Sequence, residues 1–462
     1  MIDVPAGAAT PPAQTELAQT LKSRHVAMIS FGGIIGAGLF VGSASAFSKG
    51  GPGVILIYGV IGLLIFFIMR MLGEMAVAKP GLGSFVEYSA HALDHWAGFA
   101  TGWLYWYAWV FTVGAETVAG ARLLQSAGLD ASMWAISVGL VTVLAIINLC
   151  SVKAYGEFEF WFAMVKVSAI AVFIVIGATF VGILHPRVAL TTALGHGGFL
   201  PMGVAGLFAA VPVVLFSIMG SEVATIAAAE SANPAANVAR AARTVALRIL
   251  LFYVLSIAVI VAILPWNSIA IGVSPFKSAL DAIGVPGSSK VMSIIIITAV
   301  LSCVNSGIYI TSRMLHELAT RGDAPRSLAG TAINKVPRAG ILISCLAGIL
   351  AALAQLYLRK DIFTLLVSTS GSVQLFVLLI VAVAQIRERR RLEKQRMQLK
   401  FKVWLFAWLS YAVLAGMVGV FVVLAFIPAA QTELVMSGLA VCVVIFAAVL
   451  RQRHLRVVAA AR

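Results

Sequence analysis

The stretch Gly32-Gly33-Ile34-Ile35-Gly36-Ala37-Gly38 lies in the middle of a hydrophobic segment, His25 to Ala46, that is long enough to cross a bilayer. Four glycines in seven residues weaken a helix, because each costs about 1 kcal/mol relative to alanine in a helix interior. In lipid, every backbone N–H and C=O freed by a break has to find a partner inside the protein. Unwound backbone at this depth is tolerated where it lines a cavity, which predicts a binding site for something small and polar near the membrane midplane.

The composition indicates the class of protein. Of the 462 residues, 61% are hydrophobic and 11% are charged, whereas soluble domains are about 45–50% apolar and about 25% charged. This excludes a soluble globular protein and predicts an all-α polytopic membrane protein. Apolar runs of about 20 residues predict twelve transmembrane helices, at 25–46, 53–78, 97–124, 133–152, 157–183, 203–231, 244–264, 289–316, 338–357, 362–386, 403–426 and 432–451.

The sixth predicted helix contains a second break. Its middle reads Phe216-Ser217-Ile218-Met219-Gly220-Ser221-Glu222, and Pro212 one turn earlier removes a further helical hydrogen bond. Two interrupted helices five spans apart predict a five-helix repeat, and because five is odd the second copy inserts upside down. This predicts a 5 + 5 inverted-repeat core over residues 22–386, with a site between the first and sixth helices. The alternative is that the glycines only permit close helix packing, but the clustering and the matching second break favour the repeat.

The chain has a formal charge of +15, and its basic residues lie mostly on one side of the membrane in the predicted topology. With the N-terminus in the cytoplasm, most of the 33 Lys and Arg residues lie in cytoplasmic segments, including the basic run 387–402. This distribution follows the positive-inside rule, predicts that both termini are cytoplasmic, and argues against a nucleic-acid partner. We expect 1–21 to be a disordered cytoplasmic tail, 387–402 a basic cytoplasmic linker, 403–451 two accessory helices and 452–462 a second cytoplasmic tail.

Three ionisable residues lie deep within predicted spans: Glu116, Lys166 and Glu222. Such groups cost at least about 2.5–3.5 kcal/mol in the middle of a membrane helix, so they usually face a cavity or a partner. Lys166, near the bilayer centre, is a candidate proton-coupling group, and the alternative is a static ion pair with Glu222. Glu222 directly follows the second break, where it is positioned to cap amides of the second half-helix. Glu116 is a candidate for holding a substrate ammonium or for carrying a proton.

Several motifs resemble those of one transporter family. They are 33–43 (GIIGAGLFVGS), 102–106 (GWLYW), 155–161 (YGEFEFW), 216–222 (FSIMGSE), 263–267 (ILPWN) and 321–325 (RGDAP), together with Lys166. The chain resembles the bacterial amino acid transporter family of the amino acid–polyamine–organocation superfamily, and within it the γ-aminobutyrate (GABA) permeases. The resemblance implies a LeuT-like fold in the bacterial inner membrane, a small amino acid substrate such as GABA, the proton gradient as the coupling force, and no cofactor.

The resemblance also implies roles for particular residues. Phe216 would be an aromatic gate over the substrate, and Lys166 matches the family lysine that fills the sodium position of sodium-coupled relatives. Ala37 stands where many relatives have Ser or Thr, which removes a hydroxyl contact and leaves the identity of the substrate open. The residues expected to contact substrate through backbone groups or pocket shape are Ile34, Gly36, Ala37, Gly38, Met219 and Gly220.

These features together predict alternating-access import of a zwitterion. Its carboxylate would bind amides of the first break and its ammonium would lie near carbonyls of the second break, helped by Glu116. Proton movement through Lys166, with Glu222 or Glu116, would couple uptake to the proton gradient. The alternatives are an obligate amino acid or amine exchanger and a membrane receptor for amino acids. An enzyme is not expected, because no nucleophile–base pair or metal-ligand pattern occurs within the predicted spans.

Overall fold

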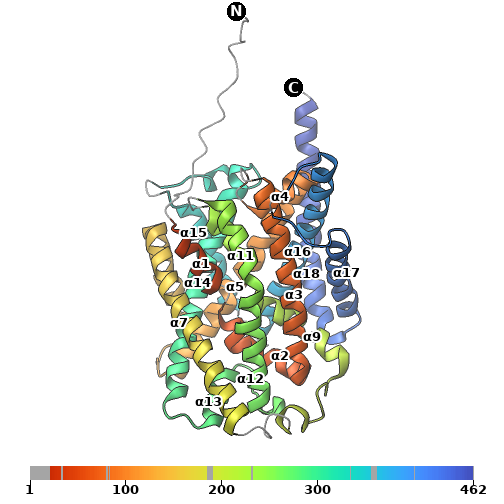
Figure 1. The fold of residues 1–462 in the computed structure, drawn as a ribbon. Helices are drawn as coiled ribbons and strands as arrows, with labels where there is room; N and C mark the ends of the chain where they lie inside the picture. Colours follow the sequence, from red (N-terminus) through yellow and green to blue (C-terminus); the bar gives the residue numbers. More distant parts are fainter. Residues whose placement is uncertain are drawn as a thin grey trace, which may run out of the picture.

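The computed structural model describes residues 21–32, 35–79, 82, 84–184, 191–229, 233–332, 335–354, 362–399 and 401–460. Over these ranges the chain forms a bundle of helices without a β-strand (Figure 1). The α-helices are α1 (Ser23–Gly32), α2 (Ser43–Gly50), α3 (Val54–Ala78), α4 (Phe85–Leu93), α5 (His95–Ser126), α6 (Met133–Cys150), α7 (Val152–Thr179), α9 (Gly203–Ile218), α10 (Val223–Ala229), α11 (Pro234–Ile249), α12 (Ser256–Ile263), α13 (Pro275–Ile283), α14 (Ser288–Thr320), α15 (Arg338–Leu353), α16 (Ile362–Lys394), α17 (Trp408–Ala425) and α18 (Pro428–Ala460). The all-helical prediction is therefore confirmed for the described residues.

Nine of the described helical segments are long and apolar enough to cross a membrane. Three differences separate this number from the twelve predicted spans. The second half of the first span runs through one 3-10 turn, η2 (Gly51–Gly53), into α3, so Gly38–Ala78 forms one apolar segment of 41 residues. The 32-residue helix α5 is rich in Trp, Tyr and Gly and is not among these nine apolar segments. Helix α15 has only 16 described residues.

The predicted break in the first span is present. Helix α1 ends at Gly32, and the chain turns through Ile35 and Gly36 before continuing as a π-helical segment, η1 (Gly38–Gly42). A Cβ added to Gly38 would lie 2.9 Å from the Phe216 ring and from the Cα of Ser217. The glycine at this position is therefore required by the close approach of another backbone.

The predicted break in the sixth span is also present. Helix α9 ends at Ile218, Met219 is extended with a ψ of 142°, and Gly220 has a φ of +111°. This backbone conformation strongly favours glycine. The chain becomes helical again at Val223, the first residue of α10. Pro212 lies inside α9, where it lacks the N–H of an ordinary helical residue.

The two broken helices lie against a central group formed by α5, α14 and α16. Helices α14 and α16 both pack along α5, α9 packs against α16 and α2, and α1 packs against α7. Helices α17 and α18 lie beside α16 at one edge of the bundle (Figure 1). The central position of α5 allows its side chains to reach both breaks.

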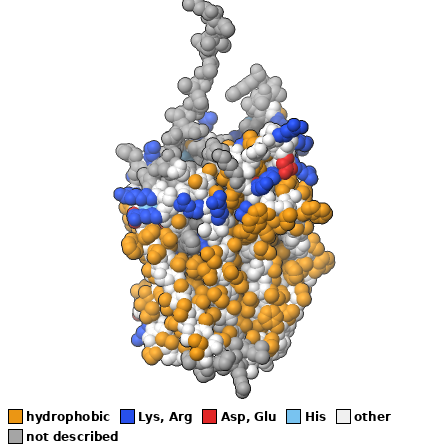
Figure 2. All heavy atoms as spheres, viewed as in Figure 1, with side chains coloured by type: hydrophobic (Ala, Val, Ile, Leu, Met, Phe, Trp, Pro, Cys, Tyr) orange, Lys and Arg blue, Asp and Glu red, His pale blue; other side chains and the backbone are white. Residues whose placement is uncertain are grey.

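The outer surface separates into two zones (Figure 2). Lys and Arg side chains gather in a band near the end at which α4 and α15 lie, and hydrophobic side chains cover most of the face below that band. Large apolar side chains on this outer surface are strongly exposed, among them Val143, Val175, Leu346 and Phe446. A belt of this kind is the surface that contacts lipid in a membrane protein.

Candidate functional site

The two breaks contact each other directly. Ser217 Oγ, at the end of α9, donates a hydrogen bond of 2.7 Å to the carbonyl of Gly38, and Tyr58 OH donates to the same hydroxyl at 3.3 Å. The Phe216 ring lies against the Cα of Gly38, where a side chain would not fit. The structure thus brings together Gly38 and Phe216, which sequence analysis placed on opposite sides of one site.

Glu116 on α5 reaches the first break. Both carboxylate oxygens accept from the backbone N–H of Ala37, each 2.9 Å from the nitrogen. Glu116 and Ala37 are buried. A Cβ on Gly36 would collide with Glu116 Oε1 and lie 2.9 Å from Cβ and Sγ of Cys303. The absence of a side chain at Gly36 is therefore what lets the carboxylate approach the amide.

Lys166 on α7 contacts the same break from the other side. Its Nζ donates to the carbonyl of Ile35 at 3.1 Å and to Ser302 Oγ on α14 at 2.8 Å. Ser302 Oγ in turn donates to Glu159 Oε1 at 2.6 Å, and this oxygen is 3.8 Å from Lys166 Nζ. Both ionisable side chains are completely buried. The amine, the hydroxyl and the carboxylate form a connected polar chain that begins at the unwound backbone.

Sequence reasoning missed Glu159, although the sequence carried a signal. Glu159 lies seven residues before Lys166, which is two turns of helix, so both side chains project from one face of α7. The ion pair considered from the sequence joined Lys166 to Glu222, whereas the carboxylate paired with Lys166 in the structure is that of Glu159.

Glu222 holds the second break in place. Its carboxylate accepts from the N–H of Gly220 at 3.2 Å, from Tyr105 OH at 3.1 Å and from Gln374 Nε2 at 2.9 Å. The sequence predicted a cap on amides of the second half-helix, whereas the amide that Glu222 contacts is that of Gly220, in the break before α10. Because Tyr105 is on α5 and Gln374 is on α16, Glu222 also links the break to the central helices.

A run of small polar residues on α16 completes the polar surroundings of the second break. Ser370 Oγ lies 3.8 Å from Met219 Sδ, donates to the carbonyl of Ala108 at 2.8 Å, and is 2.9 Å from Thr112 Oγ1. This run, Ser368-Thr369-Ser370-Gly371-Ser372-Val373-Gln374, is visible in the sequence as a polar interruption of the tenth span. It was not included among the candidate site residues.

The candidate residues gather around the two breaks, with one exception. Ile34 lies outside the described residues. Gly36, Ala37, Gly38, Glu116 and Lys166 surround the first break, and Phe216, Met219, Gly220 and Glu222 surround the second. Within the described ranges, no group of three or more His, Cys, Asp and Glu side chains is arranged to hold a metal ion.

Comparison with known proteins identifies the family of the chain. The family model described as "Amino acid permease" matches residues 25–457. The chain belongs to the amino acid permease family. It is 43% identical to the gamma-aminobutyric acid permease of Bacillus subtilis (strain 168), over 97% of each chain. It is 35% identical to the D-serine/D-alanine/glycine transporter of Escherichia coli (strain K12), over 82% of each chain.

A solved structure supports the helical fold. The nucleobase-cation-symport-1 family transporter Mhp1, in a closed conformation, matches 95% of each chain with a TM-score of 0.56 and 14% identity. At this identity the likeness concerns the fold alone. The family and the apolar helices identify a multi-pass membrane protein that transports amino acids, and the resemblance to GABA permeases inferred from the motifs is confirmed.

Proposed function

We propose that this permease imports GABA or a similar small zwitterionic amino acid together with protons, by alternating access. The observation that carries the proposal is the pair of 2.9 Å contacts between the Ala37 amide and the Glu116 carboxylate. A backbone amide at a helix break that binds the protein's own carboxylate is chemically suited to a substrate carboxylate. The surrounding groups then provide opposite polarities for the two ends of a zwitterion.

Substrate binding would exchange one carboxylate for another. The carboxylate of the amino acid would take the Ala37 amide, and Glu116 would leave it. A buried carboxylate that loses its hydrogen-bond donor is strongly disfavoured in the charged form. Substrate binding would therefore favour the protonation of Glu116, which links occupancy of the site to a proton. The substrate ammonium would lie toward the carbonyls near Met219 and Gly220, under the Phe216 ring.

The polar chain on α7 offers a second proton position. Lys166 contacts the Ile35 carbonyl and, through Ser302, the Glu159 carboxylate. A proton passing between the amine and this carboxylate would change the charge beside the unwound backbone without moving a helix. We assign proton coupling to Lys166 with Glu159, and we assign Glu222 to the support of the second break, with a role in coupling through Tyr105 and Gln374.

The membrane topology that we propose has twelve spans. Its first ten form two inverted five-helix repeats with a LeuT-like arrangement, and α17 and α18 are accessory. The breaks five spans apart support this repeat. The band of Lys and Arg at one end of the molecule (Figure 2) supports an orientation with both termini in the cytoplasm, across the inner membrane of a bacterium.

The choice of substrate depends on the walls of the site. The side chain of Ala37 is buried and has no hydroxyl, and Phe216 and Met219 are both nearly buried. The side chains of Ala37, Phe216 and Met219 offer no hydrogen-bonding hydroxyl or amide to a substrate side chain, so this part of the wall favours a substrate without a polar side chain. GABA, glycine and alanine all satisfy this condition, and the relative named after GABA supports this class.

The test is transport by the purified full-length protein in proteoliposomes. Labelled GABA, glycine, alanine and phenylalanine are supplied outside, with and without a pH gradient that is alkaline inside. We expect accumulation of GABA that collapses with a protonophore, and competition by the small neutral amino acids. Equal accumulation without the gradient would overturn proton coupling. Uptake that requires internal amino acid would instead establish obligate exchange.

A further inference from the structure

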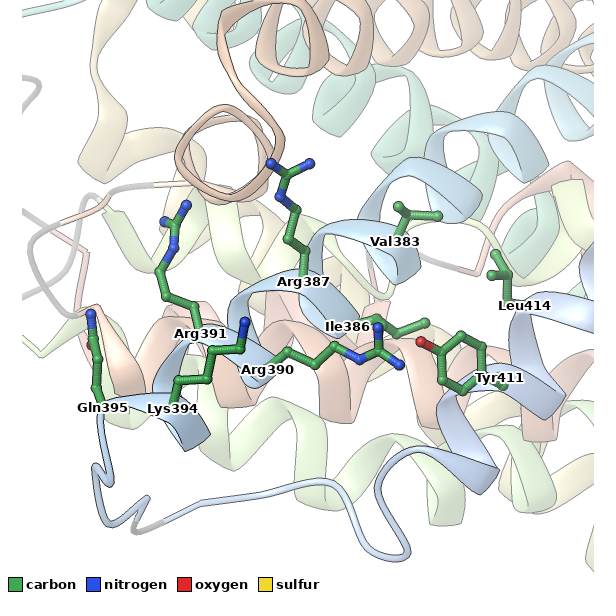
Figure 3. Close-up of a pocket in the computed structure, with 9 residues that line it drawn as sticks. All are labelled: Val383, Ile386, Arg387, Arg390, Arg391, Lys394, Gln395, Tyr411 and Leu414. Atoms are coloured by element: carbon green, nitrogen blue, oxygen red, sulfur yellow. The ribbon is translucent and has the colours of Figure 1, made fainter.

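A cavity lies away from the helix breaks, between the end of α16 and the beginning of α17. It has a volume of about 670 Å³. Four cationic side chains line it, namely Arg387, Arg390, Arg391 and Lys394, all from the last turns of α16 (Figure 3). Their sequence spacing of three, four and seven residues places them on one face of that helix. The mechanism of transport proposed above uses none of them.

Most of this positive charge is not neutralised by the protein. Arg391 Nη1 lies 3.4 Å from Glu388 Oε2, and the Arg390 guanidinium lies 5.5 Å from the centre of the Tyr411 ring. Within the described ranges, Arg387 and Lys394 have no ion pair. Four like charges within two turns of one helix repel one another, because the Debye length of about 8–10 Å is comparable to the length of two turns. A ligand with negative charge would relieve this repulsion.

Arg389 lies on a different face of α16 from the four cations that line the cavity. It projects away from the cavity and forms ion pairs with Glu74 at 3.1 Å and with Glu393 at 2.9 Å. The paired arginine thus helps to hold α16 against α3. Of the four cations that line the cavity, Arg390 points toward Tyr411 of α17, whereas Arg387 and Arg391 extend to the other side of α16 (Figure 3). Arg391 Nη1 also donates to the carbonyl of His91 on α4 at 3.3 Å.

The other wall of the cavity is apolar. On α16, Val383 lies one turn before Arg387 and Ile386 directly precedes it, and Leu414 lies about two turns after the start of α17. Trp408, at that start, is 86% exposed. Exposed tryptophans of this kind are typical of the membrane–water interface. The cavity therefore has a cationic end beyond the apolar part of α16 and an apolar end directed along the membrane-spanning part.

We propose that this cavity binds the headgroup of an anionic phospholipid, with its acyl chains along the apolar surfaces of α16 and α17. Basic pockets between transmembrane helices on the cytoplasmic side suit phosphate headgroups of this kind. Phosphate is the group recognised, because arginine forks match its oxygens. A free phosphate compound would meet the same cations but would leave the apolar end unused. Four cations favour a lipid with two phosphates, so cardiolipin binds more tightly than phosphatidylglycerol, and phosphatidylethanolamine binds least.

The experiment measures lipid retention by the purified full-length protein in detergent, using native mass spectrometry and thermal unfolding. The probes are cardiolipin, phosphatidylglycerol, phosphatidylethanolamine and inorganic pyrophosphate. The test variant is R387Q/R390Q/K394Q. The matched control R326Q/R338Q/R453Q removes the same charge from exposed positions outside the cavity. The charge-conserving variant R387K/R390K/K394R tests the site without changing the net charge.

We expect cardiolipin to bind the wild type and the control alike, and to bind the test variant on the order of a hundredfold more weakly. The charge-conserving variant is expected to bind cardiolipin more tightly than the test variant, because it keeps the positive charge, and less tightly than the wild type, because lysine lacks the guanidinium fork. Equal weakening in test and control variants would overturn the site in favour of a general surface charge effect. Binding of pyrophosphate as tight as that of cardiolipin would overturn the lipid in favour of a soluble phosphate compound.

Discussion

Replacing Gly38 by alanine is expected to force the two helix breaks apart. A Cβ at this position would lie 2.9 Å from Cδ1 and Cε1 of Phe216 and from the Cα of Ser217. Ordinary contacts between carbon atoms are about 3.5–4.0 Å. The Phe216 ring can rotate, but the backbone of Ser217 cannot yield without moving the end of α9. The variant therefore changes the spacing between the two halves of the site.

The expected cost follows from two contributions. Overpacking of a closely packed interior costs about 1–3 kcal/mol. A displaced α9 also lengthens the 2.7 Å hydrogen bond from Ser217 Oγ to the Gly38 carbonyl, and a hydrogen bond of this kind contributes about 1 kcal/mol. Alanine regains about 0.4–1 kcal/mol because it restricts the unfolded chain. The net loss of stability is therefore about 1–3.6 kcal/mol.

The matched control is Gly42, at the other end of η1. A Cβ there would lie 3.6 Å from the Ala37 carbonyl oxygen and 3.8 Å from Val213 Cγ1, which are ordinary contacts. Gly42→Ala is expected to leave stability unchanged or slightly raised. Thermal unfolding in detergent and GABA uptake in proteoliposomes compare the two variants. If Gly38→Ala unfolds at the same temperature and transports as well as Gly42→Ala, the close approach of the breaks is not a constraint.

Three further predictions concern charged groups. Glu159→Gln is expected to reduce gradient-driven uptake at least tenfold and to leave GABA counterflow within about twofold of the wild type. The reason is that the substitution removes a position for the proton but no contact with the substrate. Uptake that still follows the gradient as in the wild type would show that Glu159 has no role in coupling. Glu116→Ala frees the Ala37 amide and is expected to tighten GABA binding by roughly tenfold, as measured by calorimetry. The reason is that a hydrogen bond to a charged group contributes about 1.5–3 kcal/mol. Weaker binding would indicate that Glu116 binds the substrate ammonium instead. Asp94 caps α5, and the hydrogen bond from the His95 amide, with Arg456, holds the pKa of Asp94 below its usual range. A lowered pKa contributes stability that is present above the usual pKa and is lost as pH falls through the lowered value. Asp94→Asn should therefore be less stable than the wild type at pH 7, and the difference in unfolding experiments should shrink as the pH falls below about 4.

The sequence predicted the features that depend on local chemistry. Clustered glycines around Gly36 and the Pro212 to Gly220 stretch weaken a helix wherever it packs, so both breaks could be located from the chain alone. Lys166 could be recognised because placing a lysine in the middle of an apolar membrane helix costs free energy unless the amine has a polar partner. These arguments require no knowledge of neighbouring helices.

The pairings between helices could not be predicted in the same way. Helical periodicity places Glu159 and Lys166 on one face, but only packing reveals that Ser302 of α14 lies between them. The same limit applies to Glu116, whose position on α5 gives no sign that its partner is the Ala37 amide. Length and apolarity alone also fail to identify α5 as a span, because the Trp and Tyr residues of this central helix lower its apolarity.

The contact between Glu116 and Ala37 has a consequence for how the permease selects among solutes. In the binding mode proposed here, the Glu116 carboxylate occupies the Ala37 amide when the site is empty, so every solute that binds there has to displace it. A simple amine carries no group that could take the amide, so it would gain nothing from the exchange. The measured affinity for an amino acid would then depend on the ratio of two affinities of the Ala37 amide, one for the substrate carboxylate and one for the Glu116 carboxylate. Selectivity against amines would thus arise without any residue that repels them.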